Sequence, residues 1–133
     1  MKPVIRMKKV LFLCFLALCI VLSGCSHVKV KQNASASLRF HYGDASVDTK
    51  LSGEEATQLC DIVNGKALHR DDPSCGFDES ISFQIDGKTF CPVRDDCCIV
   101  QDRDSGKYIS ISQAERDLLE RIFENHGGFF PCE

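Results

Sequence analysis

The chain has 133 residues, and the part that follows its first 37 residues suffices for one hydrophobic core and hardly for two. All 19 acidic residues follow Cys25, whereas four of the 16 basic residues precede it, so the chain after Cys25 carries 12 basic against 19 acidic residues, a net charge of −7. This balance excludes a broad basic face for nucleic acid and does not favour anionic lipid headgroups. We therefore expect no nucleic-acid partner and attribute the charge to solubility, with a cationic partner as the alternative.

The N-terminus has the features of a targeting segment. Four basic residues within the first nine precede an uncharged run of fourteen residues from Val10 to Ser23. A transmembrane helix needs about 20 apolar residues, so this run better fits the hydrophobic region of a secretory signal, with a permanent signal anchor as the alternative. Met1 and Met7 both fit the start of translation.

The end of this run, Leu22-Ser23-Gly24-Cys25, resembles the lipobox of bacterial lipoproteins, and the resemblance covers only the first 25 residues. It implies that residues 1–24 are removed and that Cys25 is diacylated on its sulfur. It also implies a protein anchored by lipid in the cell membrane and facing the extracytoplasmic side, and Ser26 after the box permits sorting to the outer membrane in a Gram-negative host. Two or more acyl chains give stable anchoring.

Six of the nine cysteines are available for other roles. Cys14 and Cys19 would be removed with the signal, and Cys25 would carry the lipid. An even number in an exported chain of this size predicts a framework of up to three disulfides, with 15 pairings open. A zinc site is the competing interpretation, but the sequence has no Cys-x-x-Cys, and we expect neither metal nor cofactor. The disulfide candidates are Cys60, Cys75, Cys91, Cys97, Cys98 and Cys132.

The chain after Cys25 begins with small polar residues. Residues 25–37 therefore comprise the lipidated cysteine and a predicted flexible tether. We expect a single domain over residues 38–133, with no internal repeat.

The first predicted elements are a strand and a helix. Apolar alternation over residues 38–42 indicates a strand, and a hairpin that resumes over residues 45–49 after the Gly43-Asp44 turn is the alternative. A helix is expected next, from a capping box of Ser52 and Glu55 to a stop at Asn64.

The middle of the chain contains a polar loop and a hairpin. Residues 69–80 form the loop, and residues 81–91 have the pattern of a hairpin whose Asp86-Gly87 turn is typical of type I′. In this register Cys91 points away from the apolar face of the hairpin.

A further strand begins within residues 95–100. Its Cys97 and Cys98 would point to opposite faces, so that one of them could lie on the outer face with Cys91. A turn over residues 104–106 then leads to a returning strand.

The last predicted element is a helix that begins with a capping box of Ser112 and Glu115 and ends at Gly127. The order of elements predicts an α+β fold. We expect a single small domain, disulfide-stabilised, with a mainly antiparallel sheet of about four strands and two helices packed on one face. The opposite face of the sheet, or its edge, is where a partner could bind.

The sequence carries no recognisable catalytic motif. It has no G-x-S-x-G, no H-E-x-x-H and no glycine loop for phosphate. Its histidines are scattered and fit surface or capping positions, and its paired aspartates at Asp71-Asp72 and Asp95-Asp96 fit solvated loops. The histidines are His27, His41, His69 and His126.

The functional prediction is therefore a membrane-anchored extracytoplasmic lipoprotein that acts as a non-catalytic binding module for an envelope protein or ligand. The alternative is a thiol-redox or metal-handling lipoprotein that uses Cys91, Cys97 and Cys98. Hydrolysis of an envelope substrate is the third interpretation. Free thiols would favour the redox class, and complete oxidation would favour the binding module.

Overall fold

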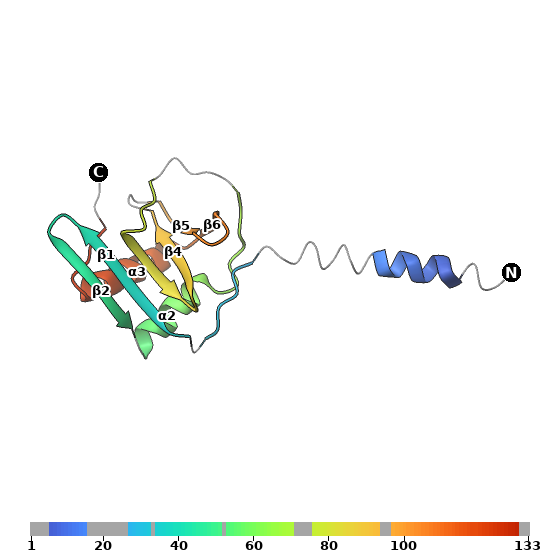
Figure 1. Ribbon diagram of the computed structural model, residues 1–133, viewed down its shortest axis with the longest axis horizontal. Helices are drawn as coiled ribbons and strands as arrows, with labels where there is room; N and C mark the ends of the chain where they lie inside the picture. Colours follow the sequence, from blue (N-terminus) through green and yellow to red (C-terminus); the bar gives the residue numbers. More distant parts are fainter. Residues whose placement is uncertain are drawn as a thin grey trace.

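The computed structural model describes residues 6–15, 27–32, 34–51, 53–70, 76–93 and 97–130. Six antiparallel strands form one sheet in the spatial order β2-β1-β3-β4-β5-β6, and two helices pack on one of its faces (Figure 1). The strands are β1 (Ala36–Tyr42), β2 (Ala45–Leu51), β3 (Ile81–Ile85), β4 (Lys88–Pro92), β5 (Ile99–Asp102) and β6 (Lys107–Ser110). The helices are α2 (Glu54–Val63) and α3 (Gln113–Asn125). The predicted α+β class is confirmed.

The sheet has six strands, not the four or so expected from the sequence. The difference arises mainly at β2, where the alternate residues Ser46, Asp48 and Lys50 are exposed and only Leu51 is fully buried. A strand at the edge of a sheet needs less apolar surface than a central one, so its pattern is weak. β1 by contrast buries Leu38 and shows the predicted alternation.

The second hairpin forms as predicted. Asp86 and Gly87 have φ angles of 53° and 75°, the positive values that a type I′ turn requires. This turn places Phe83 opposite Phe90, whose rings stack with centroids 5.4 Å apart on the helix-facing side of the sheet. Local turn chemistry thus fixes a register that buries both rings.

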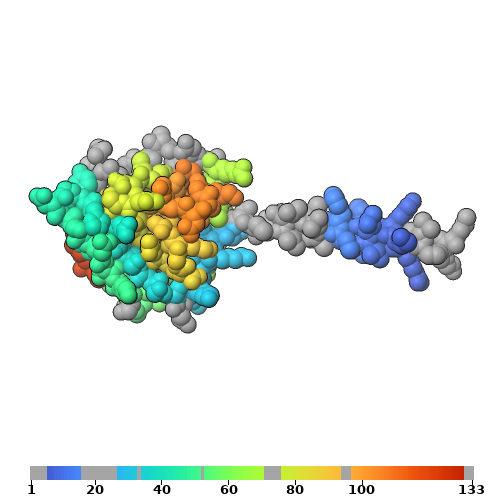
Figure 2. Space-filling model, in the orientation of Figure 1, coloured from blue at the N-terminus to red at the C-terminus, as the bar shows by residue number. Residues whose placement is uncertain are grey.

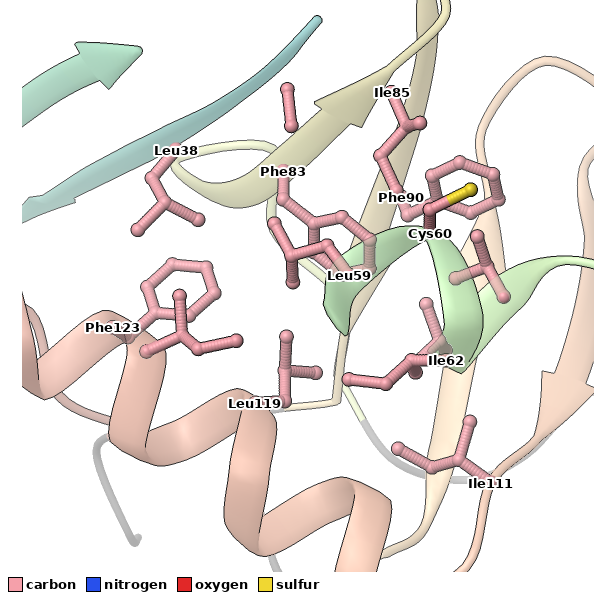
Figure 3. Packing of buried hydrophobic residues seen from close by; sticks show 14 of the residues in the cluster. Leu38, Leu59, Cys60, Ile62, Phe83, Ile85, Phe90, Ile111, Leu119 and Phe123 are labelled. Carbon is pink, nitrogen blue, oxygen red and sulfur yellow. The ribbon is translucent and has the colours of Figure 1, made fainter. Parts of the chain in front are cut away.

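The core lies between the sheet and the two helices. Figure 3 shows Leu59 of α2 and Phe123 of α3 beside Phe83 and Leu38 of the sheet. All four side chains are buried, with exposed fractions between 0% and 2%. A domain of about a hundred residues buries enough apolar surface in this way to fold without covalent cross-links.

The predicted capping box of α3 is confirmed. The backbone N–H of Glu115 donates to Ser112 Oγ at 3.1 Å, and the backbone N–H of Ser112 donates to Glu115 Oε1 at 2.9 Å. Lys66 Nζ also donates to Glu115 Oε1 at 2.7 Å. Burial would raise the pKa of Glu115, but the hydrogen bonds from Lys66 and Ser112 outweigh it and lower the pKa. The helix is followed by Gly127 with φ 88°, the expected stop.

The predicted capping box of α2 is wrong. The N-cap is Gly53, and no side chain caps this helix end. Glu55 instead pairs with His126, with 2.8 Å between Glu55 Oε1 and His126 Nε2, and so joins α2 to the end of α3. Ser52 lies outside the described residues. The C-terminal prediction holds, because α2 ends before Asn64.

The chain packs against the domain from residue 27, earlier than the expected start at residue 38. Val28 and Val30 are part of the core. The backbone N–H of Val28 donates to Lys66 O at 2.9 Å, and that of Gly65 donates to Val28 O at 2.8 Å. Val28 and Val30 lie two residues apart, which in an extended segment places both side chains toward the core.

Residues 6–15 form a helical segment whose residues are all exposed. Among the described residues, no helix has both the length and the apolar character needed to cross a membrane. The lipobox residues and Cys25 lie outside the described part of the chain.

Candidate functional site

The face of the sheet that carries no helix, which we call the outer face, is partly covered. Glu79 lies over this face, where its backbone O accepts from Ser82 Oγ of β3 at 2.9 Å and its Oε1 accepts from Arg103 Nε and Nη2 at 3.0 and 2.8 Å. Phe77 covers Tyr108 of β6, with ring centroids 5.3 Å apart. Cys91 on this face is 0% exposed. Figure 2 views the molecule from the side of the sheet, with β1 and β2 in blue-green.

The part of the outer face formed by β2, β1 and β3, which we call the open half, carries a row of polar side chains in contact with one another. His41 Nδ1 lies 2.8 Å from Ser46 Oγ, and His41 Nε2 lies 2.9 Å from Asp48 Oδ2. Arg39 Nε donates to Asp48 Oδ1 at 3.4 Å. The contacts follow from the hairpin register, which places His41 opposite Ser46 and Arg39 opposite Asp48.

A shallow groove of about 230 Å³ adjoins this row of polar side chains. Its charged lining residues are Arg39, Asp48 and Lys50, and Gln84 of β3 adds an amide. The groove therefore offers donors and acceptors of both charge signs. Such a surface suits a polar partner that is recognised by hydrogen bonds and ion pairs.

Ser46, His41 and Asp48 are the residue types of an acyl-transfer triad. Here the serine binds Nδ1 and the aspartate binds Nε2, the reverse of the usual arrangement. The side chains of His41 and Asp48 are 40% and 59% exposed, so water competes for every contact that would activate Ser46. The geometry orients polar groups at a surface and gives little support to hydrolysis.

The predicted disulfides are not borne out among the described cysteines. Cys60, Cys91, Cys97 and Cys98 are all free thiols, while Cys75 and Cys132 lie outside the described residues. The sheet separates Cys60, which faces the core from α2, from Cys91 on the outer face.

The distance along the strands also keeps Cys91 from Cys97. Cys91 lies opposite Gln101, which is four residues beyond Cys97, a span of roughly 13 Å in an extended chain. A disulfide needs Cα atoms within about 7 Å. Cys91, Cys97 and Cys98 therefore do not form one site, and Cys98 instead packs partly against the core.

The two buried thiols are poor nucleophiles. Burial raises the pKa of Cys91 to about 11, and the nearby Arg103 offsets this only in part. Burial also raises the pKa of Cys60, whose thiol donates to Lys31 O at 3.6 Å. The half-buried pair of Cys97 and Cys98 is more accessible to reagents.

A buried arginine holds the chain next to this pair. Arg116 of α3 is 4% exposed, and its Nη1 donates to Val93 O at 2.9 Å and to Cys97 O at 3.3 Å. Its guanidinium carbon lies 4.5 Å from the centre of the Phe130 ring. Cys98 Sγ donates to Gln113 Oε1 at 3.4 Å. The thiol pair thus lies in a segment positioned by α3.

The histidines occupy separate places in the fold. The backbone of His27 forms an isolated β-bridge with Ala67. His69 Nε2 lies 3.2 Å from Ser110 Oγ, while His41 and His126 make the contacts given above. Within the described ranges, no three His, Cys, Asp or Glu side chains gather into a group that could hold a metal. The Asp71-Asp72 and Asp95-Asp96 pairs lie outside those ranges.

The sequence analysis missed three contacts, namely Glu55 with His126, Arg116 with Val93 O, and His41 with Asp48. The first two join residues that are distant in sequence and had no signal in the pattern. The third could have been found by pairing residues across the Gly43 turn. No family model, curated protein or solved structure matches the chain.

Proposed function

We propose that this chain is an exported, lipid-anchored domain that binds an envelope protein or ligand through the open half of its outer face, without catalysis. The observation that carries the proposal is the row of polar side chains beside a groove, formed by Ser46, His41, Asp48 and Arg39. These side chains contribute nothing to the core, yet neighbouring side chains orient them. A surface that is ordered and polar in this way suits recognition of a partner.

The anchor is proposed from the resemblance of residues 22–25 to a lipobox. An acylated Cys25 would lie only three residues before Val28, which is buried in the domain. Three extended residues span about 10 Å, so the domain would sit close to the lipid headgroups rather than on a long tether. The proposed location is the extracytoplasmic side of the cell membrane.

Photo-crosslinking in cells of the native host tests the binding face. A benzophenone amino acid at Gln84 in the open half should give a discrete adduct, and Arg39→Glu should abolish it. The matched control is the same probe at Glu124, an exposed residue of α3. Equal adducts at Gln84 and Glu124, or an adduct at Gln84 that is indifferent to Arg39→Glu, would contradict the proposed face.

The second candidate function is thiol chemistry, and the free thiols of the described cysteines favour it. The strand geometry narrows this candidate to Cys97 and Cys98, because Cys91 lies apart from them. Mass spectrometry of the protein after stepwise exposure to glutathione redox buffers measures whether this pair oxidises reversibly. Reversible oxidation that Cys97→Ser abolishes would support this candidate, and a pair that stays reduced throughout would exclude it.

A further inference from the structure

The two edges of the sheet differ. At β6, His69 and Tyr108 exchange two backbone hydrogen bonds of 2.9 Å, so part of this edge is covered. At β2, seven consecutive residue pairs join the strand to β1 without a bulge, and no described segment pairs with its other side. A long, regular, uncovered edge is a template for another strand.

The register shows which backbone groups of β2 face outward. The backbone N–H of His41 donates to Ser80 O at 2.8 Å, so it points away from β2 and toward β3. His41 and Ser46 are therefore a non-hydrogen-bonded pair. Because the pattern alternates, the backbone groups of Ser46, Asp48 and Lys50 point to the free edge. The carbonyl of Lys50 accepts only a 3.4 Å contact from the neighbouring Thr49 hydroxyl within the described chain.

We propose that a second copy of this chain pairs with β2 in antiparallel orientation, with Thr49 opposite Thr49 on a two-fold axis. This register joins the outward backbone groups of Asp48 to those of Lys50 in the partner, and it does so twice. It also places the two side chains of opposite charge side by side on the outer face. A shift by two residues would set Asp48 against Asp48, and a shift by one would misalign the backbone donors and acceptors.

The opposite signs of these charges distinguish the edge from a protected one. Edge strands that resist association commonly present charges that repel a second copy. Here Asp48 and Lys50 of one copy complement Lys50 and Asp48 of the other in a register that also pairs the outward backbone groups. Val47 then lies opposite Leu51 on the helix-facing side. The sheet would run on through both copies, and the two open halves would join into one polar surface.

Exchanging the charges of Asp48 and Lys50 tests this inference, and the test does not depend on lipidation. Light scattering on the full chain in mild detergent should find a dimer. Asp48→Lys and Lys50→Asp should each weaken the dimer at least about tenfold, because each places like charges opposite one another twice. The double variant should restore it, and Arg121→Asp on exposed α3 is the control. A monomeric wild-type chain, or a dimer indifferent to the single variants, overturns the inference.

A cross-link tests the register separately from the charges. Thr49 would form a non-hydrogen-bonded pair with Thr49 of the partner, with Cα atoms about 4.5 Å apart, which a disulfide can span. Mild oxidation of Thr49→Cys should therefore give a dimer in which peptide mapping finds the two introduced thiols bonded to each other. Val47→Cys lies opposite Leu51 and should not cross-link. Equal cross-linking of both variants, or of neither, contradicts the proposed register.

Discussion

Replacement of Arg116 by methionine removes the buried guanidinium that holds the segment before β5. The variant loses hydrogen bonds of 2.9 Å to Val93 O and 3.3 Å to Cys97 O, and the contact with Phe130. Hydrogen bonds to a charged group are worth about 1.5–3 kcal/mol each, while burying the guanidinium itself carries a desolvation cost that methionine avoids. We expect a net loss of about 2–4 kcal/mol in the free energy of unfolding.

Thermal unfolding followed by far-ultraviolet circular dichroism measures this loss on the full chain in mild detergent. For a domain of this size, 1 kcal/mol lowers Tm by about 4–8 °C, so Arg116→Met should lower it by more than about 8 °C. The matched control is Arg121→Met on the exposed side of α3, with an expected effect below about 0.5 kcal/mol. Alkylation of Cys97 in the folded protein should also become faster in Arg116→Met. If the two methionine variants unfold alike, Arg116 does not have the stabilising role assigned to it.

Three further predictions follow from other contacts. The pKa of Glu115 is lowered in the folded chain, so its contribution to stability is present above the pKa of an unfolded glutamate and is lost as the pH falls through the lowered value. The difference of about 1 kcal/mol in the free energy of unfolding between wild type and Glu115→Gln should therefore narrow as the pH is lowered from 7 toward 3, and a constant difference would refute this. Because the pKa of Cys91 is raised to about 11, peptide mapping after iodoacetamide treatment at pH 8 should find Cys97 labelled well before Cys91, and equal rates would contradict its burial. A Cβ at Gly128 would lie 3.2 Å from Phe123 O and from the Phe40 ring, so Gly128→Ala should lower the free energy of unfolding by about 1–3 kcal/mol, measured by chemical denaturation. Gly76→Ala, with open space around it, is the control, and equal denaturation midpoints for the two variants would argue against this packing.

The accurate predictions were those that depend on residues close together in the sequence. The Ser112 and Glu115 box and the Asp86 turn each depend on residues within four positions, and both form as the sequence indicates. Glu55 had the same spacing from Ser52 as Glu115 has from Ser112, yet it pairs with His126, which only the packing of two helices brings near. The same local pattern thus forms a cap at Glu115, where the distant Lys66 joins the box, and fails at Glu55, where His126 takes the carboxylate.

The candidate site was predicted only as a face. Alternation on the strands indicated that one side of the sheet would be uncovered, but the contacts of His41 require the register of β2, whose weak apolar pattern hid it as a separate strand. The disulfide expectation rested on the number of cysteines and the proposed compartment. It failed for Cys60 and Cys91 because the sheet separates them from each other and the strand spacing keeps Cys91 from Cys97, which a count of residues does not encode.

The intact mass of the protein extracted from the membranes of its host tests the lipid anchor directly. We expect a chain that begins at Cys25 and carries the added mass of at least two acyl chains, with the lipid mapped to the N-terminal peptide. A mass equal to the unmodified chain from Met1 or Met7, with Cys25 free to react with a thiol reagent, would contradict the lipid-anchored domain proposed for this sequence.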